Sequence, residues 1–160
     1  MGSPSLIVPA RKMTVGPALL LLLVLWPAAA QEESPYEKFQ RQHVDTAPGW
    51  EQDLDLYCKL MIQRRNVSVD FCKPVNSFIH KELEVITAVC GAAGTPCPGN
   101  YHYSNSNFTV TDCRAMGAWP NCNYRGSQDQ KQICLACDNG EPVHYGRPAE
   151  CGKKAGWGGN

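Results

Sequence analysis

The chain has 160 residues, of which 43% are hydrophobic and 19% charged, and its formal net charge at neutral pH is zero. This balance excludes a strongly basic surface, so any affinity for nucleic acid must come from a local cluster of cations. Nine cysteines in so short a chain favour a disulfide-stabilised exported protein over a cytosolic one.

The first thirty residues predict a secretory signal peptide. Arg11 and Lys12 precede an apolar run over residues 15–26, and Ala28-Ala29-Ala30 supplies small residues for cleavage. The run is shorter than the ~20 apolar residues of a membrane-spanning helix, so we expect no membrane span. Cleavage after Ala30 would remove two of the 15 basic residues and none of the 15 acidic ones, leaving a net charge of about −2 on a secreted, extracellular protein.

The rest of the chain suits one domain, assigned to residues 31–146, followed by a flexible glycine-rich tail over residues 147–160. All nine cysteines follow the signal peptide. A small exported domain buries limited apolar surface, so disulfides are its expected reinforcement. A zinc site is the alternative interpretation, but Cys134–Cys137 is the sole C-x-x-C pair and no second pair accompanies it.

The first predicted helix begins at a capping signal. Ser34-Pro35-Tyr36-Glu37 places Ser at the N-cap, Pro at the first helical position and Glu three residues after the cap. The helix that follows brings Tyr36, Phe39 and His43 to one face through spacings of three and four.

Two further helices are predicted before residue 91. One runs from about residue 53 to 65 and turns Tyr57, Leu60 and Met61 inward. The other runs from about residue 80 to 90, and its inward positions are Leu83, Ile86 and Val89 or Cys90.

The second half of the chain has the pattern of strands. Residues 91–100 are rich in Gly, Pro and Asn and predict a loop. Strands are predicted at 108–116, 121–125 and 133–137, with an edge strand at 142–145. Helices first and antiparallel strands later define an α+β domain. Two sequons, Asn66-Val67-Ser68 and Asn107-Phe108-Thr109, predict glycosylation at Asn66 and Asn107 where they lie on the surface.

Three segments carry a resemblance to a known family. Cys72-Lys73-Pro74-Val75-Asn76-Ser77-Phe78 resembles the C-K-x-x-N-T-F signature of the pancreatic ribonuclease (ribonuclease A) superfamily, with Ser in place of Thr. Phe39-Gln40-Arg41-Gln42-His43 is similar to its F-x-R-Q-H segment, and Pro142-Val143-His144-Tyr145 to its closing P-V-H-F. The resemblance covers about residues 36–145 and implies three helices packed on a curved, V-shaped antiparallel sheet.

The same resemblance implies the disulfide pairing: Cys58 with Cys113, Cys72 with Cys122, and Cys90 with Cys137. The family's fourth bridge begins at Cys97, but its partner position holds Tyr101. Angiogenins lack that bridge too, so an angiogenin-like branch is an alternative. Cys97, Cys134 and Cys151 are left over; two of them could form a novel bridge and leave one free or intermolecular thiol. Sequence reasoning leaves the choice of pair open.

RNA cleavage needs a base for the ribose 2′-OH, an acid for the departing 5′-oxygen, and positive charge at the phosphorane. Two histidines and a lysine meet these needs without a metal or cofactor. The resemblance implies that His43 is the base, His144 the acid and Lys73 the stabilising cation. The family's acidic partner of the second histidine is replaced by Gly146, which predicts a modest loss of rate.

The resemblance also implies the groups that contact substrate. Gln42 and the backbone N–H of Tyr145 would bind the scissile phosphate, and Asn76 and Ser77 belong to the signature, with Ser77 reading a pyrimidine. Asn100 matches a contact to the second base. Lys38, Arg41 and Lys131 would bind flanking phosphates. The other two histidines are expected to be structural (His80) and solvated (His102).

These residues predict a secreted, metal-free endoribonuclease that cleaves single-stranded RNA 3′ of pyrimidines through a 2′,3′-cyclic phosphate. The alternative is an angiogenin-like signalling or host-defence protein with weak ribonuclease activity. A catalytically dead binding protein conflicts with the complete set of His43, Lys73 and His144. We expect a monomer whose partners are single-stranded RNA and a cytosolic ribonuclease inhibitor.

Overall fold

A computed structural model describes residues 2–13, 29–47 and 53–153 of the chain. The chain divides into two units, residues 1–32 and 33–160. The described residues of the first unit form no helix or strand, and the apolar part of the expected signal peptide lies outside them. No helix in the described ranges is long and apolar enough to cross a membrane.

Three α-helices lie in the first half of the second unit: α1 (Pro35–His43), α2 (Leu54–Arg64) and α3 (Leu83–Thr87), which continues as a 3-10 helix over Ala88–Cys90. The predicted capping box is present: the Ser34 hydroxyl accepts from the Glu37 N–H, and the Glu37 carboxylate accepts from the Ser34 N–H. The inward face of α1 is also confirmed, since Phe39 and His43 are buried.

The other two helices differ in part from the prediction. Leu60 of α2 is 36% exposed, whereas Cys58 and Ile62 are buried, because the disulfide of Cys58 fixes which side of α2 meets the sheet. The third helix begins at Leu83, not near residue 80, because the His80 N–H donates to the Thr109 carbonyl and prolongs the strand before it.

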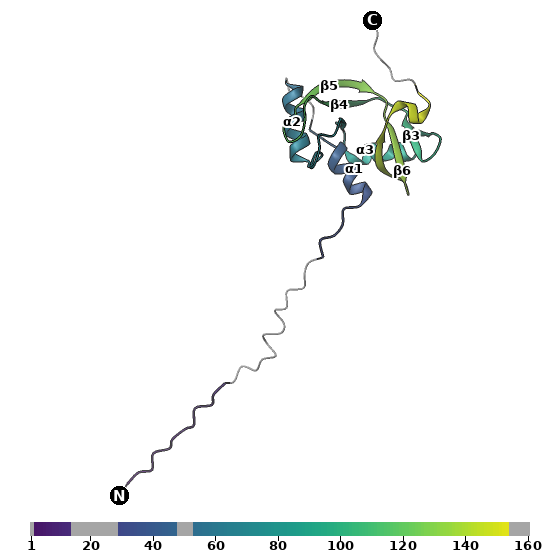
Figure 1. Ribbon diagram of the computed structural model, residues 1–160. Coiled ribbons are helices and arrows are strands. Elements are labelled where there is room, and N and C mark those ends of the chain that lie inside the picture. The colour runs from purple at the N-terminus through teal and green to yellow at the C-terminus, as the bar shows by residue number, and fades with distance from the viewer. Residues whose placement is uncertain (1, 14–28, 48–52, 154–160) are drawn as a thin grey trace. The chain divides into compact units, whose positions relative to one another are not determined.

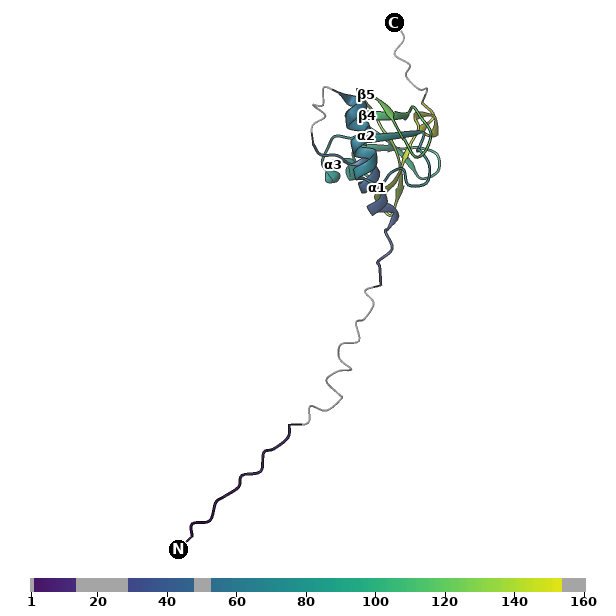
Figure 2. The same cartoon turned by 60° about the vertical axis from the view of Figure 1, so that its left-hand side comes forward.

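Within the described residues, seven strands form two antiparallel sheets. The first has the order β1-β4-β5, with β1 at Val75–Ile79, β4 at Phe108–Ala115 and β5 at Tyr124–Lys131. The second has the order β2-β3-β6-β7, with β2 at Gly94–Pro96, β3 at Tyr101–Ser104, β6 at Cys134–Asp138 and β7 at Glu141–Gly146. Figures 1 and 2 show α2 beside the sheet that contains β4 and β5. The predicted α+β class with three helices is confirmed.

Sequence reasoning missed or shortened several strands. It assigned the whole of residues 91–100 to a loop, yet Gly94–Pro96 pairs with residues 102–104 as β2 against β3. It predicted a strand over residues 121–125, whereas β5 pairs with β4 as far as Lys131. The sequence of β5 is mostly polar, so it lacks the alternation of apolar and polar residues by which strands are predicted. Its hydrogen bonds to β4 stabilise it without that alternation.

Three disulfides are present among the described residues, and they are the pairs that the resemblance implied: Cys58–Cys113, Cys72–Cys122 and Cys90–Cys137. The first and third join helices to strands, and the second joins the segments that precede β1 and β5. One core cluster, around Tyr57 and Phe78, lies between α2 and the β1-β4-β5 sheet. A second cluster, around Phe39 and Leu135, lies under α1 and α3. Cys137 is oxidised, so the Cys134–Cys137 pair does not supply two thiolates to a metal.

The C-terminal segment corrects another expectation. Residues 147–160 were predicted to be a flexible tail, but Pro148–Cys151 forms a 3-10 helix, η4. The Arg147 N–H donates to the Glu150 carboxylate at 2.6 Å, and Cys151 is 7% exposed. The buried thiol anchors this turn, although glycine content alone suggested disorder. Residues 154–160 lie outside the described part of the chain.

Candidate active site

A cleft of about 420 Å³ is lined by residues from α1 and from both sheets. His43 comes from the end of α1, Lys73 from the segment before β1, and His144 from β7. The structure thus gathers into one cleft three groups that are separated by up to a hundred residues of sequence. Contacts of α1 with both β1 and β7 hold the two sheets at this point.

His43 is held in one orientation by the backbone of β1. Its Nδ1 lies 2.8 Å from the Ser77 carbonyl oxygen, and because a carbonyl only accepts, Nδ1 carries the proton and Nε2 keeps its lone pair. The ring stacks on Tyr145 with centroids 5.6 Å apart. Burial, helped by the charges of Lys73 and His144, lowers the pKa of His43 to about 3, against the bond to Ser77. The imidazole is therefore neutral at physiological pH.

Lys73 is positioned by an amide that links β1 to α1. The Asn76 Oδ1 accepts from the Lys73 Nζ at 2.9 Å, and the Asn76 Nδ2 donates to the Gln42 carbonyl at 2.9 Å. Burial, followed by the charges of Lys38 and Arg41, lowers the pKa of Lys73. Asn76 is buried and has both ends of its side chain satisfied, so it sets where the ammonium lies.

The second imidazole lies at the open side of the cleft. His144 is exposed and lies on β7 opposite Ala136 of β6. The next residue but one, Gly146, is buried, and a Cβ there would lie 2.6 Å from the Glu150 carboxylate and 2.7 Å from the Tyr101 ring. The space that a side chain at 146 would need is thus already filled by Tyr101 and Glu150, which explains the glycine at this position.

A hydrogen-bonded chain lines the part of the cleft next to His43. The Ser77 hydroxyl donates to the Asp112 carboxylate, and Asp112 also pairs with the Lys131 ammonium. Burial and the charge of Asp112 raise the pKa of the Tyr145 phenol, and the neighbouring Ser77 acts against this rise. Ser77, Asp112 and Lys131 together form a polar wall suited to reading hydrogen-bond donors and acceptors.

Four of the predicted substrate contacts do not line this cleft: Gln42, Asn100, Lys38 and Arg41. Gln42 contributes its backbone carbonyl to Asn76, as described above. The Asn100 amide donates to the Cys137 carbonyl at 3.2 Å.

The guanidinium of Arg41 is bound to other protein groups and is not free to contact a phosphate. It pairs with Glu33 at 2.6 Å and donates to the carbonyls of Arg65 and Asn66 at 2.6 and 3.0 Å. The ion pair with Glu33 raises the pKa of Arg41 against the effect of burial. Lys38 is exposed on α1 and is close enough for its charge to act on Lys73.

The two remaining histidines have different environments. His80 is structural, as predicted: its Nε2 lies 2.7 Å from the Thr111 hydroxyl and its Nδ1 lies 3.0 Å from the Ala47 carbonyl. His102 was predicted to be solvated, but it is half-buried in β3, and within the described ranges its Nδ1 has no hydrogen-bond partner. His102 is partly covered because β3 pairs with β2 on one side and β6 on the other. The polar sequence of this stretch gave no sign of that pairing.

Sequence reasoning did not assign a role to Asp112, Arg114 or Arg147, which also line the cleft. Asp112 lies directly opposite Ser77 in the β1–β4 ladder. The period of two in β4 places Asp112 and Arg114 on one face, but only the strand register shows that this face meets Ser77.

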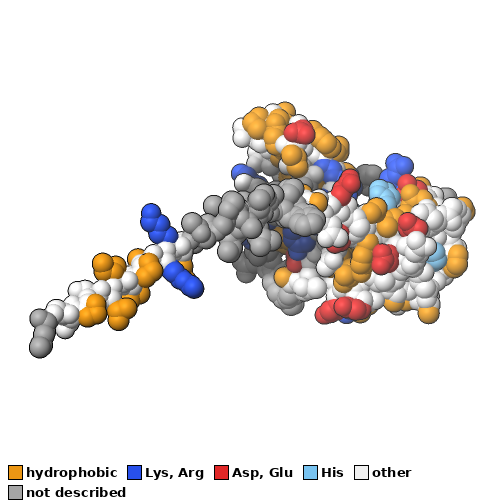
Figure 3. All heavy atoms as spheres, turned by 90° about the horizontal axis from the view of Figure 1, so that it is seen from below, with side chains coloured by type: hydrophobic (Ala, Val, Ile, Leu, Met, Phe, Trp, Pro, Cys, Tyr) orange, Lys and Arg blue, Asp and Glu red, His pale blue; other side chains and the backbone are white. Residues whose placement is uncertain are grey.

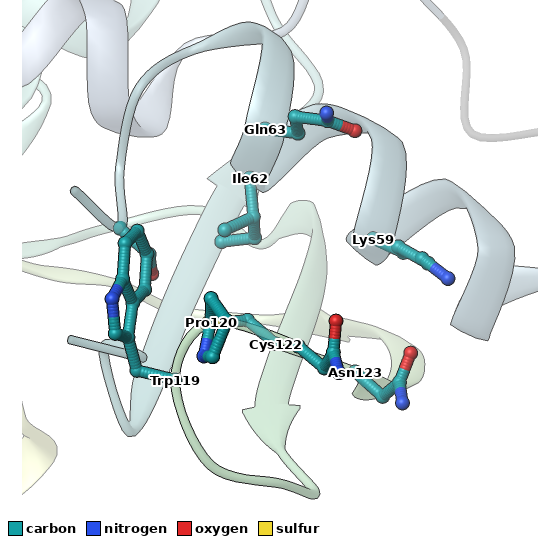
Figure 4. Close-up of a pocket in the computed structure, with 9 residues that line it drawn as sticks. Lys59, Ile62, Gln63, Trp119, Pro120, Cys122 and Asn123 are labelled. Carbon is teal, nitrogen blue, oxygen red and sulfur yellow. The ribbon is translucent and has the colours of Figure 1, made fainter. Parts of the chain in front are cut away.

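A second hollow, of about 460 Å³, lies between α2 and the loop at residues 119–123 (Figure 4). Its titratable lining group is Lys59, and neither an imidazole nor a carboxylate lines it. It therefore lacks the two imidazoles that line the first cleft. On the face shown in Figure 3, acidic and basic side chains are interspersed with apolar ones, in keeping with the absence of a dominating basic surface.

The helices, the two sheets and a cleft holding two imidazoles and an ammonium define the class of protein as a ribonuclease-like α+β domain. The family model for pancreatic ribonuclease matches residues 34–148, and the chain belongs to this family. It is therefore a ribonuclease, an enzyme whose substrate is RNA.

Relatives of known structure or function agree with this assignment. The chain is 44% identical over 117 residues to a ribonuclease of Chelonia mydas, with 72% of this chain and 98% of the relative covered. It is 41% identical over 140 residues to angiogenin-4 of Mus musculus, covering 83% and 95%. The crystal structure of green turtle egg white ribonuclease is similar with a TM-score of 0.69 at 44% identity, covering 72% and 98%.

Proposed function

We propose that this ribonuclease is secreted and cleaves single-stranded RNA on the 3′ side of pyrimidines, through a 2′,3′-cyclic phosphate and without a metal. The observation that carries the proposal is the convergence of His43, Lys73 and His144 on one cleft. RNA supplies its own nucleophile, the ribose 2′-OH, so the enzyme needs a base, an acid and a cation around one phosphodiester.

In the first step His43 is the base. Its Nε2 lone pair is free of the bond that Nδ1 makes to Ser77, and its lowered pKa keeps it neutral. It removes the 2′-OH proton as the 2′-oxygen attacks phosphorus. His144, exposed at the other side of the cleft, protonates the departing 5′-oxygen. Hydrolysis of the cyclic phosphate then uses the same two groups with their roles exchanged.

Lys73 stabilises the negative charge that builds on the phosphorane. Its ammonium is fixed by Asn76, so little reorganisation is needed as the charge develops. A group held in advance of the reaction lowers the barrier more than a freely moving surface lysine would, because a surface lysine loses rotamer entropy when it orders. Asn76 thus acts as a positioning residue. The backbone N–H of Tyr145 is proposed to bind the same phosphate; the Gln42 side chain, which lies outside the cleft lining, would have to turn inward to do so.

The polar wall supports a pyrimidine site with a preference for uracil. Because the Ser77 hydroxyl already donates to Asp112, it is left to accept the N3–H of uracil. Cytosine offers an acceptor at N3, so Ser77 would have to release Asp112 to bind it. The Tyr145 ring provides the flat apolar surface against which a base can lie.

The test is cleavage of the dinucleotides uridylyl-adenosine, cytidylyl-adenosine and adenylyl-adenosine by the chain from residue 31 onwards, in EDTA. We expect a cyclic phosphate product from the two pyrimidine substrates, faster for uridine, and little from the third. Loss of cleavage in EDTA would refute the metal-free mechanism. Equal rates on all three substrates would refute the pyrimidine site while leaving the family assignment intact.

Export is tested separately. Expression of the full chain in a eukaryotic secretory host should give extracellular protein beginning at Gln31, with glycans on Asn66 and Asn107, both of which are exposed in the structure. Retention of residues 1–30 in the cell-associated protein would contradict it. A cytosolic ribonuclease inhibitor as partner, and the monomeric state, are proposed from the family resemblance and are checked by inhibition titration and light scattering.

The second candidate function is an angiogenin-like signalling or host-defence role. The observation that favours it is Tyr101 in place of the cysteine that would close a bridge with Cys97, together with the similarity to angiogenin-4. Endothelial and bactericidal assays of the wild type beside His144→Asn separate the two functions. A biological response that persists at weak turnover would favour the second.

A further inference from the structure

Three cysteines outside the disulfides lie close together in the folded chain. Cys97 lies in the turn between β2 and β3, Cys134 begins β6, and Cys151 ends η4. The turn η4 packs on both β3 and β6, which brings its cysteine to the other two. Cys97 and Cys151 line one hollow of about 330 Å³ beside Tyr103 and Lys153.

Cys151 is the central member of this thiol cluster. The Cys97 and Cys134 thiols both act on the pKa of the Cys151 thiol, so the three sulfurs are neighbours. The three differ in access: Cys97 is half-buried at the rim of the hollow, whereas Cys134 is 2% exposed and Cys151 is 7% exposed. An oxidant from solvent therefore reaches Cys97 first, and the sulfur next to it is that of Cys151.

We propose that Cys97 and Cys151 form a fourth disulfide and that Cys134 stays beneath it as a buried thiol. This rests on the proposed export of the chain, since disulfides persist in oxidising compartments. Within the described ranges no group of three or more His, Cys, Asp or Glu side chains is arranged to hold a metal ion, so a bridge suits the cluster better than a metal site.

The bridge forms by two thiol–disulfide exchanges with a low-molecular-weight disulfide such as oxidised glutathione. The Cys97 thiolate attacks one sulfur of the oxidant, forms a mixed disulfide and expels a thiolate. The Cys151 thiolate then attacks the Cys97 sulfur, forms the protein disulfide and expels the second thiolate. Two electrons pass to the oxidant, and the two cysteine protons go to the two released thiols.

The pKa of both attacking thiols affects the rate. Burial raises the pKa of Cys97 and of Cys151 to about 11, so little thiolate is present near neutral pH. Bridge formation in the folded, reduced protein is therefore slow at pH 7 and accelerates with pH. During folding, before burial, the same thiols react faster.

The bridge would fasten one wall of the active-site cleft. Arg147, Pro148 and Glu150 of the C-terminal segment line that cleft, and burial followed by the charge of Glu150 raises the pKa of Tyr101. Tyr101 occupies the position from which the sequence resemblance expected a short local bridge to Cys97. A long-range bridge to Cys151 would replace that local bridge and tie the end of the domain to the β2–β3 turn.

The experiment is refolding of the chain from residue 31 onwards in a glutathione redox buffer, followed by alkylation with iodoacetamide and peptide mapping. We expect a cross-linked peptide pair containing Cys97 and Cys151, with Cys134 alkylated only after denaturation. A Cys134–Cys151 or Cys97–Cys134 bridge, or three alkylated thiols, would overturn the proposal. Because the readout is mass and the oxidant is supplied, failure of export or of RNA cleavage leaves this result unaffected.

Two variants sharpen the test. Cys134→Ser is the matched control and should keep the bridge; loss of the bridge in this variant also overturns the proposal. Cys151→Ser should leave Cys97 open to alkylation in the folded protein and lower Tm by roughly 10 °C, because the unfolded chain loses a long-loop constraint. An unchanged Tm, with Cys97 still protected, would contradict the pairing.

Discussion

The two sheets are held to the rest of the domain in different ways. The β1-β4-β5 sheet packs on α2 through Tyr57 and Phe78 and is fastened by two disulfides, Cys58–Cys113 and Cys72–Cys122. The β2-β3-β6-β7 sheet has one, Cys90–Cys137, together with the thiol cluster. The first sheet supplies Ser77 and Asn76, which hold His43 and Lys73, and the second sheet carries the exposed His144.

This difference assigns separate tasks to the two regions. From the first sheet, Ser77 fixes the tautomer of His43, and Asn76 fixes Lys73. From the second, His144 extends into a cleft whose far wall is the C-terminal segment. The proposed base and cation are thus held by hydrogen bonds to the first sheet, whereas the proposed acid is exposed on the second.

Removing one catalytic group from each region should have the largest effect. His144→Asn and Lys73→Ala should each lower kcat on uridylyl-adenosine by roughly 10²–10⁴-fold, because proton transfer and charge stabilisation each contribute on that scale. His102→Asn is the matched control, since His102 lies in β3 and does not line the cleft. Activity of His144→Asn close to that of the wild type would show that the acid is a different group.

Removing one disulfide from each sheet compares the stability that the two sheets gain from their disulfides. Cys58→Ala with Cys113→Ala, and Cys90→Ala with Cys137→Ala, should each lower the free energy of unfolding by roughly 2–5 kcal/mol. The loops have similar lengths, 55 and 47 residues, so loop entropy predicts similar losses. Cys58 and Cys113 have no exposure, so packing should make the first loss the larger. Urea unfolding measures both, and the reverse order would refute the comparison.

The buried base should make stability depend on pH. His43 is neutral in the folded state until pH falls to about 3, whereas in the unfolded chain it binds a proton below about pH 6.5. Its contribution to stability is therefore fully present above pH 6.5 and is lost as pH falls from there towards 3.

The measurement is urea unfolding between pH 7 and pH 4 for the wild type and His43→Asn. Asn does not titrate, and its Nδ2 can still donate to the Ser77 carbonyl. We expect the variant to have the shallower slope of stability against pH over this window. Parallel slopes would mean that burial of His43 does not set the pH dependence.

The smallest expected effect concerns base choice in the first sheet. Asp112→Ala should free the Ser77 hydroxyl to donate to cytosine and so reduce the preference for uridine over cytidine by about five-fold, the value of one hydrogen bond. The ratio of kcat/KM on uridylyl-adenosine and cytidylyl-adenosine measures it. Asp138→Ala, an exposed acid at the end of β6, is the control. An unchanged ratio would separate Asp112 from base recognition.

Local sequence signals gave the helices and much of the second half of the chain. The capping box at Ser34 and the spacing of Phe39 and His43 determine α1, because both depend on residues within two helical turns. The signature around Lys73 and the closing segment around His144 gave the family, and with it the three disulfides. These features reside in short stretches of chain, so a reader of the sequence can find them.

Pairing between distant strands was not readable in the same way. β5 is polar, β2 and β3 lie in a stretch rich in Gly, Pro and Asn, and only the register of β1 on β4 sets Asp112 against Ser77. Likewise, Arg41 was expected to bind a phosphate, but its guanidinium pairs with Glu33 and donates to the two carbonyls that follow α2. Such facts depend on contacts between residues far apart in the chain, which no local pattern encodes.

The sequence by itself therefore determined the α+β class and the family, and it named the two histidines and the lysine of the proposed site. The tertiary structure alone decided which nitrogen of His43 is available, what holds Lys73, and that the chain beyond Gly146 folds back to bury Cys151. The physical reason is that residue type fixes which chemistry is possible, whereas tautomer, orientation and burial are set by neighbours that only the folded chain brings within hydrogen-bond distance.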